Sequence, residues 1–427
     1  FFGLRRGGKA FYALDVSNPD SPAFLWKIDK GSSGFEELGQ SWSVPAVTYV
    51  PGYASSGVPK PVLIFGAGYD TAKDSKNTVA GADGEGRGVF IVDAQTGAKV
   101  WSVTPADNGT RNLQATGLQY SMPADVTVLD SNGDGLTDRI YAPDTGGNVW
   151  RVDLPGNALP GASQTTWRIT KLAALNTSAT DGHAGDRRFF SATDVVRARD
   201  STLGIFDAVM IGSGDRENPN ATDNVDRLYM LRDRQTGVYA TVAPTPQECT
   251  DGSTDHRCVL PITNADLYDA TLNLIQDGTS TERAAAQIAL AGKEGWYIDL
   301  TAATGEKALA RSLTIAGKVY FTTYSPPGET SVSQCEPPAG AGRLYVLNML
   351  NATAANDFNG DDALARSDRL VQLGSLIPDT PAPHFGSDKK IRLLFPSGGS
   401  IQGQVNPYDT GARLRQPYGT YWYDQEY

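Results

Sequence analysis

The feature that most constrains the fold is a hairpin pattern that recurs along the chain. In each copy a glycine precedes a short apolar and aromatic strand, and an aspartate or an equivalent residue ends that strand before a turn and an outgoing strand. Two copies carry Gln-Thr-Gly at the turn, and a Thr-Gly turn between alternating strands indicates a β-hairpin. The clearest copies are residues 8–27, 88–103 and 147–153, and the weaker copies are residues 226–242, 296–309 and 342–348.

A second pattern precedes several of these hairpins. Residues 43–47, 122–126 and 191–195 each lead to a further apolar strand, so that one unit holds about four strands, the content of a propeller blade. Clear units recur about every 60–80 residues, which is longer than the ~40–50 residues of an ordinary blade. The sequence therefore predicts an all-β fold, a single modified β-propeller over residues 1–427 with about six to seven blades and long loops.

Helical periodicity is sparse in this sequence. Residues 281–292 are the best helix candidate and residues 363–370 the second, and both are predicted to be short insertions between strands. The glycine-rich strings at residues 66–68 and 212–214 are each followed by Asp and a polar loop instead of a helix, so we interpret them as strand ends and not as phosphate-binding loops.

Charge and hydropathy limit the function classes. The net charge of −11 repels phosphate backbones, which argues against nucleic-acid binding and favours contact with divalent cations. No stretch approaches the ~18–20 apolar residues of a membrane-spanning helix. The chain begins at Phe1 without Met, and we interpret it as the C-terminal fragment of a longer protein, so the lack of a signal peptide says nothing of the parent's destination.

The loop at residues 130–138 has the spacing of a calcium-binding loop of EF-hand type. Oxygen donors stand at relative positions 1, 3, 5 and 9, and a glycine stands at position 6, where the chain must turn sharply. Calcium prefers about six to eight oxygen ligands, which a tightly wound loop can supply. The predicted ligands are the side chains of Asp130, Asn132, Asp134 and Asp138 and the backbone carbonyl of Leu136.

This loop departs from the full EF-hand in two respects. Tyr141 stands at position 12, where the EF-hand has a bidentate glutamate, and residues 139–142 indicate a strand instead of an exit helix. The ion would therefore sit in a self-contained loop between two strands. The alternative is a metal-free turn rich in Asp, Asn and Gly, although three unpaired aspartates so close together would repel one another.

Residues 357–361 repeat the 1, 3, 5 spacing of this loop. Position 6 is Asp362 instead of glycine, and position 9 is Ala365, which has no side-chain oxygen. Asp368 could reach inward only from a longer loop. A second metal site and a capped turn before a short helix both remain open for this segment.

The cysteines and histidines do not form a metal or catalytic pattern. Cys249 and Cys258 lie in one polar loop and are predicted to form a disulfide, which indicates an oxidising compartment, whereas the partner of Cys335 stays open. The three histidines fall in separate polar loops without ligand spacing, and no nucleophile motif is present. We therefore expect a protein that is not an enzyme.

Four stretches in this order carry a family resemblance: GKAFYALDVS, LDSNGDGLTDRIYAPDTGGNVWRVDL, GWYIDLTAATGEK with FTTYSP after it, and GRLYVLN. Together they resemble the C-terminal domain of the PilY family, also called PilC, of type IV pilus biogenesis and tip adhesin proteins. The resemblance covers residues 8 to about 410, and the predicted calcium loop is its sharpest motif, with all four side-chain ligands matching.

The resemblance implies a modified β-propeller on a secreted, pilus-associated protein. It implies that calcium in the 130–138 loop influences pilus extension against retraction, and with it twitching motility and surface attachment. The implied partners are pilins, with a host surface contacted through an N-terminal adhesin region that this chain lacks. The implied location is the fimbrium and cell surface, associated with the outer membrane and reached through the periplasm. The integrin-binding Arg-Gly-Asp of some members is absent here, so integrin binding is not expected.

Two other functions compete with this interpretation. Residues 93–101 look like the blade-locking repeats of quinoprotein dehydrogenases, whose calcium binds the quinone cofactor, but the 130–138 loop supplies most of its own ligands and leaves little room for a quinone. The chain also lacks the adjacent cysteines that cover that cofactor. The other alternative is a structural or carbohydrate-binding propeller in which calcium only stiffens a loop.

Overall fold

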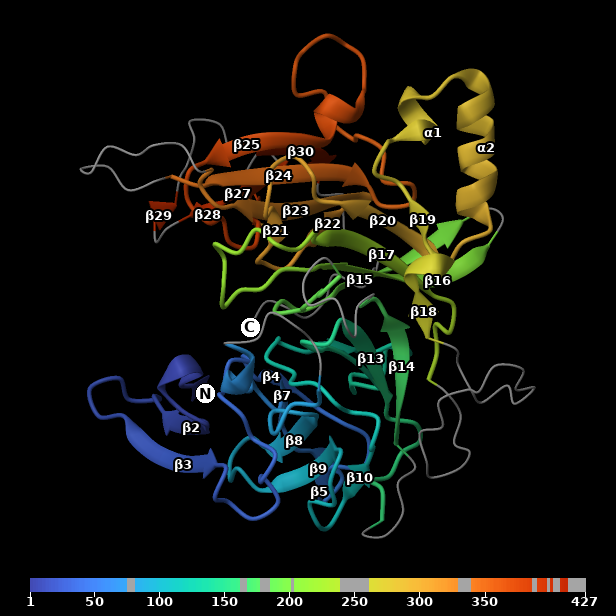
Figure 1. Ribbon diagram of the computed structural model, residues 1–427. Coiled ribbons are helices and arrows are strands. Elements are labelled where there is room, and N and C mark those ends of the chain that lie inside the picture. The colour runs from blue at the N-terminus through green and yellow to red at the C-terminus, as the bar shows by residue number, and fades with distance from the viewer. Residues whose placement is uncertain are drawn as a thin grey trace.

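The computed structural model is built almost entirely from antiparallel β-sheets (Figure 1), which confirms the predicted fold class. Within its described part, six sheets have three or more strands, in agreement with the predicted six to seven blades. Two short hairpins accompany them, β5 (Ala54–Ser55) with β6 (Val58–Pro59) and β28 (Pro396–Ser397) with β29 (Ser400–Ile401). The structure describes residues 1–74, 81–161, 167–176, 185–200, 203–238, 261–328, 339–385, 390–397, 400–401 and 408–413.

The first three sheets follow the chain in order and occupy the lower half of Figure 1. Sheet 1 contains β1 (Phe2–Gly3), β2 (Ala10–Asp15) and β3 (Ala23–Asp29). Sheet 2 contains β4 (Ala46–Thr48), β7 (Val62–Gly66), β8 (Val89–Asp93), β9 (Lys99–Thr104) and β10 (Asn112–Gln114). Sheet 3 contains β11 (Thr127–Leu129), β12 (Arg139–Pro143), β13 (Asn148–Asp153), β14 (Arg168–Ala174) and β18 (Ile262–Thr263).

The remaining three sheets fill the upper half of the same view. Sheet 4 contains β15 (Asp194–Asp200), β16 (Gly204–Gly212), β17 (Arg227–Asp233), β20 (Gly295–Asp299) and β19 (Tyr268–Asp269). Sheet 5 contains β21 (Lys307–Ala308), β22 (Leu313–Ile315), β23 (Lys318–Ser325), β24 (Ala341–Asn348) and β25 (Leu370–Gly374). Sheet 6 contains β26 (Ala382–Phe385), β27 (Lys390–Leu394) and β30 (Tyr408–Arg413).

Sheets 2, 3 and 4 differ from an ordinary four-stranded blade by a fifth strand. In each of them one short strand is added in parallel: β10 on β9, β18 on β14, and β19 on β20. The strands β18 and β19 come from one segment after β17 but extend two different sheets. This segment therefore ties sheet 3 to sheet 4.

Successive sheets pack face to face, and one apolar cluster lies between each neighbouring pair from sheet 1 to sheet 6. The strand β7 shows how the sequence directs this packing. Leu63 and Phe65 lie in the cluster with sheet 1, whereas Val62 and Ile64 lie in the cluster with sheet 3. A strand buried on both faces is a continuous apolar run, because its alternate side chains point to opposite neighbours.

Buried tryptophans lock two of these interfaces. Trp26 of sheet 1 donates its indole N–H to the Ala94 carbonyl at 3.0 Å. The ring also covers Gly97, where an added Cβ would lie 2.9 Å from a ring carbon. Trp296 of sheet 4 likewise donates to the Met349 carbonyl at 2.9 Å. Each tryptophan thus holds the turn that follows a strand of the next sheet.

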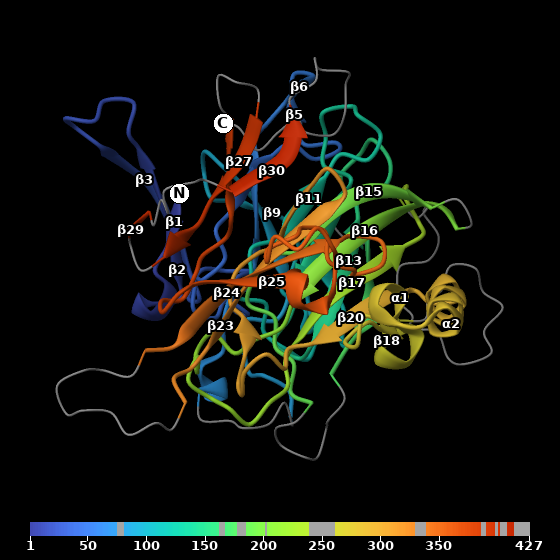
Figure 2. The same cartoon turned by 90° about the horizontal axis from the view of Figure 1, so that it is seen from above.

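The predicted insertion at residues 281–292 is confirmed as α2 (Ser280–Ala291), which follows the short α1 (Leu274–Asp277). Thr279 begins α2 with a capping box, accepting from the Glu282 amide at 3.3 Å while its own amide donates to the Glu282 carboxylate at 2.8 Å. Both helices lie to one side of the sheets when the molecule is seen from above (Figure 2). No helix in the described ranges has the length and apolar character needed to cross a membrane.

Three local predictions are wrong. The described part of residues 226–242, which ends at residue 238, does not form a simple hairpin, because β17 pairs with β16 and with the distant β20. Residues 296–309 are not one either, since β20 belongs to sheet 4 and β21 to sheet 5. Residues 363–370 contain only the 3-10 turn η4 (Arg366–Arg369), after which Leu370 begins β25. In the described residues the other 3-10 turns are η1 (Arg5–Gly7), η2 (Thr71–Lys73) and η3 (Asn264–Asp266).

Candidate calcium loop

The predicted calcium loop connects two antiparallel strands of sheet 3. β11 and β12 pair in the register Leu129 to Arg139, and the Asp138 amide donates to the Leu129 carbonyl at 2.9 Å. Near its end the loop also touches sheet 2, because the Thr137 amide donates to the Tyr49 carbonyl at 2.8 Å. Backbone hydrogen bonds therefore fix the two ends of the loop. The side chains of the loop determine only the conformation of the turn between those ends.

Asp130 organises that turn. Its carboxylate accepts hydrogen bonds from the amides of Gly133 at 2.6 Å, Gly135 at 2.7 Å and Asp134 at 3.2 Å. Gly133 and Gly135 have φ angles of 79° and 84°, in the left-handed region that glycine adopts at little cost. A Cβ at either glycine would meet no atom within 4 Å, so backbone conformation and not space requires glycine there.

Asn132 and Asp134 occupy the exposed tip of the loop. The Asn132 side-chain oxygen accepts from the Asp134 amide at 2.9 Å, and the Asp134 carboxylate accepts from the Leu136 amide at 2.8 Å. The Asn132 side-chain amide also donates to Asp134 at 3.1 Å. The tip is therefore a sequence of side-chain-to-backbone turns that fixes both predicted ligands close to the loop backbone.

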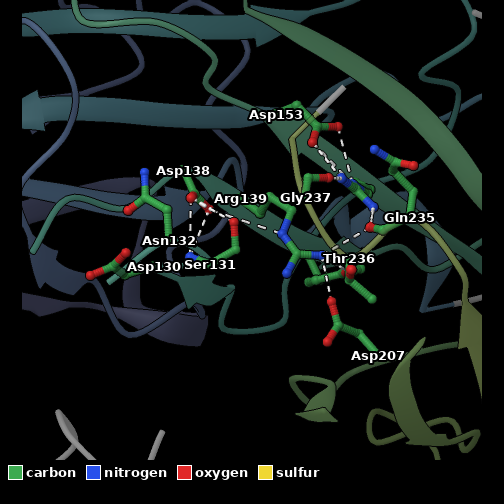
Figure 3. A network of polar contacts seen from close by, with 12 residues as sticks. Asp130, Ser131, Asn132, Asp138, Arg139, Asp153, Asp207, Gln235, Thr236 and Gly237 are labelled. Atoms are coloured by element: carbon green, nitrogen blue, oxygen red, sulfur yellow. Dashed lines mark hydrogen bonds and ion pairs between the residues drawn. The ribbon is translucent and has the colours of Figure 1, made fainter. Parts of the chain in front are cut away.

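Asp138 differs from the other three side-chain ligands because it is buried, with 5% of its surface exposed. Its carboxylate accepts from the Ser131 amide at 3.0 Å and the Ser131 hydroxyl at 2.6 Å (Figure 3). Burial raises the pKa of Asp138 from its ordinary value, although the hydrogen bonds from Ser131 and the charge of Arg139 oppose that shift. A buried carboxylate short of positive charge lies at the base of the loop.

The donor chemistry of the loop fits calcium. Its candidate ligands are carboxylate, amide and carbonyl oxygens, the hard donors that calcium selects. Each carboxylate oxygen has two lone pairs, so a bond from a backbone amide leaves acceptor capacity for a cation. A finished cage is not present, because the described residues contain no group of three or more His, Cys, Asp or Glu side chains arranged to hold a metal ion. Calcium binding by these residues stays a prediction.

The second Asp-rich segment repeats the hydrogen bonds of the first. The Asp357 carboxylate accepts from the amides of Gly360 at 2.7 Å and Asp362 at 2.9 Å, and the Asn359 oxygen accepts from the Asp361 amide at 2.9 Å. Asp368 reaches inward after all, accepting from the Phe358 amide at 3.3 Å. Phe358 is the second residue of its loop, and Ser131 is the second residue of the first loop. The Ser131 amide likewise donates a hydrogen bond to Asp138. Two separate segments that share the pattern Asp-x-Asn-Gly-Asp thus form the same hydrogen-bonding scaffold.

The remaining candidate residues are the three cysteines and the three histidines. Cys249, Cys258 and Cys335 lie outside the described residues, as do His183 and His256, so the predicted disulfide stays a prediction. His384 lies in the short strand β26.

Sequence reasoning missed the buried charged side chains behind the loop, chiefly Arg139 and Arg151. Each of these arginines has only 1% of its side chain exposed. Their signal in the sequence was weak, because polar residues that alternate along a strand normally indicate a solvent-facing side.

The six consecutively packed sheets define a β-propeller, and comparisons with known proteins agree. Residues 1–205 match the family model described as the PilY1 beta-propeller domain. The chain also matches the crystal structure of the Pseudomonas aeruginosa PilY1 C-terminal domain with a TM-score of 0.61. That match covers 93% of this chain and 78% of the solved one at 19% identity, and so it shows the fold alone.

Curated relatives extend the family relation along the chain. A type IV pilus biogenesis factor PilY1 homolog of Xylella fastidiosa is 26% identical over 373 residues, which is 83% of this chain and 22% of the relative. The type IV pilus biogenesis factor PilY1 of P. aeruginosa is 27% identical over 359 residues, or 76% of this chain and 27% of the relative. The predicted resemblance to the PilY family is confirmed by these matches. This chain spans about a quarter of the length of these relatives.

Proposed function

We propose that this chain is the calcium-binding propeller of a type IV pilus biogenesis factor and is not an enzyme. The observation that carries the proposal is the coincidence of two independent features. The PilY1 propeller match includes residues 130–138, and the structure forms those residues into an ordered loop with hard oxygen donors. In this proposal the side chains of Asp130, Asn132, Asp134 and Asp138 and the carbonyl of Leu136 hold the ion.

The physical basis for regulation is the charge of the loop. Three carboxylates lie within nine consecutive residues, and one of them is buried. Their mutual repulsion disfavours the compact loop, and a bound divalent cation would supply the opposing charge. Asp130 and two glycines already shape the turn, so binding would stabilise this compact form of the loop and shift a local equilibrium toward it.

The proposed readout is the balance between pilus extension and retraction, and thus twitching motility and surface attachment. The proposed partners are pilins and other pilus components, with any host contact made outside this chain. The proposed location is the fimbrium at the outer surface, reached through the periplasm. The names of the relatives support the pilus role, because they are type IV pilus biogenesis factors.

The test is a chromosomal Asp134→Ala substitution in the bacterium that encodes this chain. We expect normal amounts of the protein, with surface piliation or twitching that no longer responds to external calcium. Asp361→Ala, at the same position of the second Asp-rich loop, is the matched control and should retain the calcium response. Unchanged calcium response in Asp134→Ala would overturn the proposed regulation. An absorption spectrum of the purified protein separately tests for a bound quinone, which the proposal does not require.

A further inference from the structure

A buried network of charged side chains begins directly behind the calcium loop. On β12 and β13 the register places Arg139 opposite Asp153 and Tyr141 opposite Arg151, so these four polar side chains share one face of sheet 3. Tyr141 belongs to the apolar cluster between sheets 3 and 4, so this face packs against sheet 4. Charged groups in such an interface are stable only when they are paired.

The opposing face of sheet 4 supplies the partners. There Asp207 lies directly opposite Asp233 on the neighbouring strand, a like-charge pair that is unfavourable by itself. Arg139 bonds to Asp207 at 2.7 Å, and Arg151 bonds to Asp233 at 2.7 Å. Arg151 also pairs with Asp153 of its own sheet at 2.6 Å. Two arginines from sheet 3 therefore hold together two aspartates of sheet 4.

The same arginines hold a surface turn of sheet 4. Arg151 donates to the carbonyls of Gln235 at 2.5 Å and Gly237 at 2.6 Å. Arg139 donates to the Gln235 carbonyl at a longer 3.3 Å (Figure 3). Arg197 donates to the Thr236 carbonyl at 2.7 Å. Three consecutive carbonyls of one turn are thus bound by arginine side chains. The position of the turn depends on where those side chains point.

Arg139 faces two aspartates, Asp207 of sheet 4 and Asp138 at the base of the calcium loop. The contact with Asp138 is the longer of the two, 3.9 Å from the Asp138 carboxylate to the Arg139 Nε. That buried Nε has no hydrogen-bond partner. Arg139 is therefore shared between Asp207, which holds it closely, and Asp138, which attracts it from the loop side.

We propose that Arg139 is a positioning residue that couples calcium binding at the 130–138 loop to the turn at residues 235–237. The inference rests on the proposed calcium site. A cation on Asp138 would remove the attraction that Asp138 exerts on Arg139, and Arg139 would then bind Asp207 and the Gln235 carbonyl more closely. By thermodynamic reciprocity, whatever holds Arg139 toward sheet 4 also favours calcium at Asp138.

Asp207→Asn tests the coupling from the far side. The substitution keeps the shape of the side chain but removes the charge that holds Arg139 away from the loop. Arg139 would then compete with calcium for Asp138, and we expect calcium affinity to fall by about fivefold or more. Asp299→Asn is the matched control, because Asp299 pairs with Arg227 at 2.5 Å in the same sheet without touching the loop, and it should leave the affinity unchanged. Arg139→Met removes the cation that competes for Asp138 and should raise calcium affinity, whereas Arg139→Lys keeps the charge and should raise it less.

Hydrogen exchange of the full chain supplies a second readout that does not depend on a variant. The Gln235 amide donates to Asp233 at 3.0 Å and reports on the turn. Calcium should slow exchange at residues 233–237 in the wild type and not in Asp134→Ala. Calcium binding with unchanged affinity in Asp207→Asn and unchanged exchange at the turn would overturn the coupling and leave the proposed function standing. A wild-type protein that binds no calcium would overturn both.

Discussion

The two Asp-rich loops form the same turn but attach it to different parts of the molecule. In both loops the first aspartate accepts hydrogen bonds from the backbone amides at the fourth and sixth positions. The last aspartate accepts a hydrogen bond from the backbone amide at the second position. In the first loop that last aspartate is Asp138, which directly precedes β12 and lies next to the buried charged side chains. In the second loop it is Asp368, three residues further along and inside the 3-10 turn η4.

The difference teaches that hydrogen bonds shape the turn and that the last carboxylate decides what the turn is connected to. Asp138 lacks close positive charge and adjoins the sheet 3 to sheet 4 interface. Asp368 instead accepts from a second amide, that of Ala365 at 3.0 Å, and so stabilises its own local turn. We therefore expect the first loop to respond to a cation and the second to contribute mainly to stability.

The largest expected effect that separates the loops is stabilisation by calcium. Free calcium at about one hundred times its dissociation constant should raise the free energy of unfolding by about 2.7 kcal/mol, because only the folded loop binds it. Urea unfolding with calcium and with chelator measures this difference. Asp361→Ala should keep the stabilisation and Asp134→Ala should lose it. Equal losses in the two variants would erase the distinction between the loops.

Replacing the last aspartate of each loop by alanine should destabilise the protein more in the second loop than in the first. In calcium-free protein we expect Asp368→Ala to lower the free energy of unfolding by about 2 kcal/mol, because two partly buried backbone amides lose their acceptor. Asp138→Ala should cost about 1 kcal/mol, since losing its unfavourable burial offsets part of the lost hydrogen bonds. Chemical denaturation of both variants in chelator decides the order, and a larger loss for Asp138→Ala would contradict the comparison.

The sixth position gives a smaller, purely conformational test. Gly135 and Asp362 both have left-handed φ angles, 84° and 60°. Gly135→Ala should cost about 1 kcal/mol, because the added Cβ meets no neighbouring atom but disfavours that φ. Asp362→Gly should change stability by less than about 0.5 kcal/mol, because relief of strain is offset by the entropy of glycine in the unfolded chain. A large loss in Asp362→Gly would show that its side chain has a further role.

The pH dependence should be the smallest difference. Burial raises the pKa of Asp138, so the folded protein binds that proton more tightly than the unfolded chain does. As the pH falls from 7 toward about 4, the stability of calcium-free wild type should increase relative to Asp138→Asn, and the gain should disappear as the pH rises through the raised pKa. Denaturation curves at several pH values give this difference, and a relative decrease on acidification would contradict the burial argument.

Sequence patterns predicted the local parts of this structure well. Alternation in residues 88–103 predicted β8 and β9, and the spacing around Asp130 predicted a tight turn before a strand. These features are set by neighbouring residues, through side-chain period and through side-chain-to-backbone hydrogen bonds.

Predictions that depended on distant contacts fared less well. β17 pairs with β20, although a long segment separates the two strands in the sequence. The prediction that β17 would pair with the stretch directly after it was therefore wrong. Arg151 finds Asp233 at a separation of 82 residues, which no local pattern encodes. Asp368 lies beyond the expected ligand spacing, and only the backbone path of residues 361–368 brings it back to Phe358. The buried half of the candidate site thus required the fold.

Calorimetric titration of calcium into chelator-treated wild type, Asp134→Ala and Asp361→Ala tests the central claim most directly. The account predicts saturable binding in the wild type and in Asp361→Ala, and a loss of about one hundredfold or more in Asp134→Ala. No binding heat in the wild type under conditions where the protein is folded, or affinity that Asp134→Ala leaves intact, would contradict the assignment of calcium to residues 130–138.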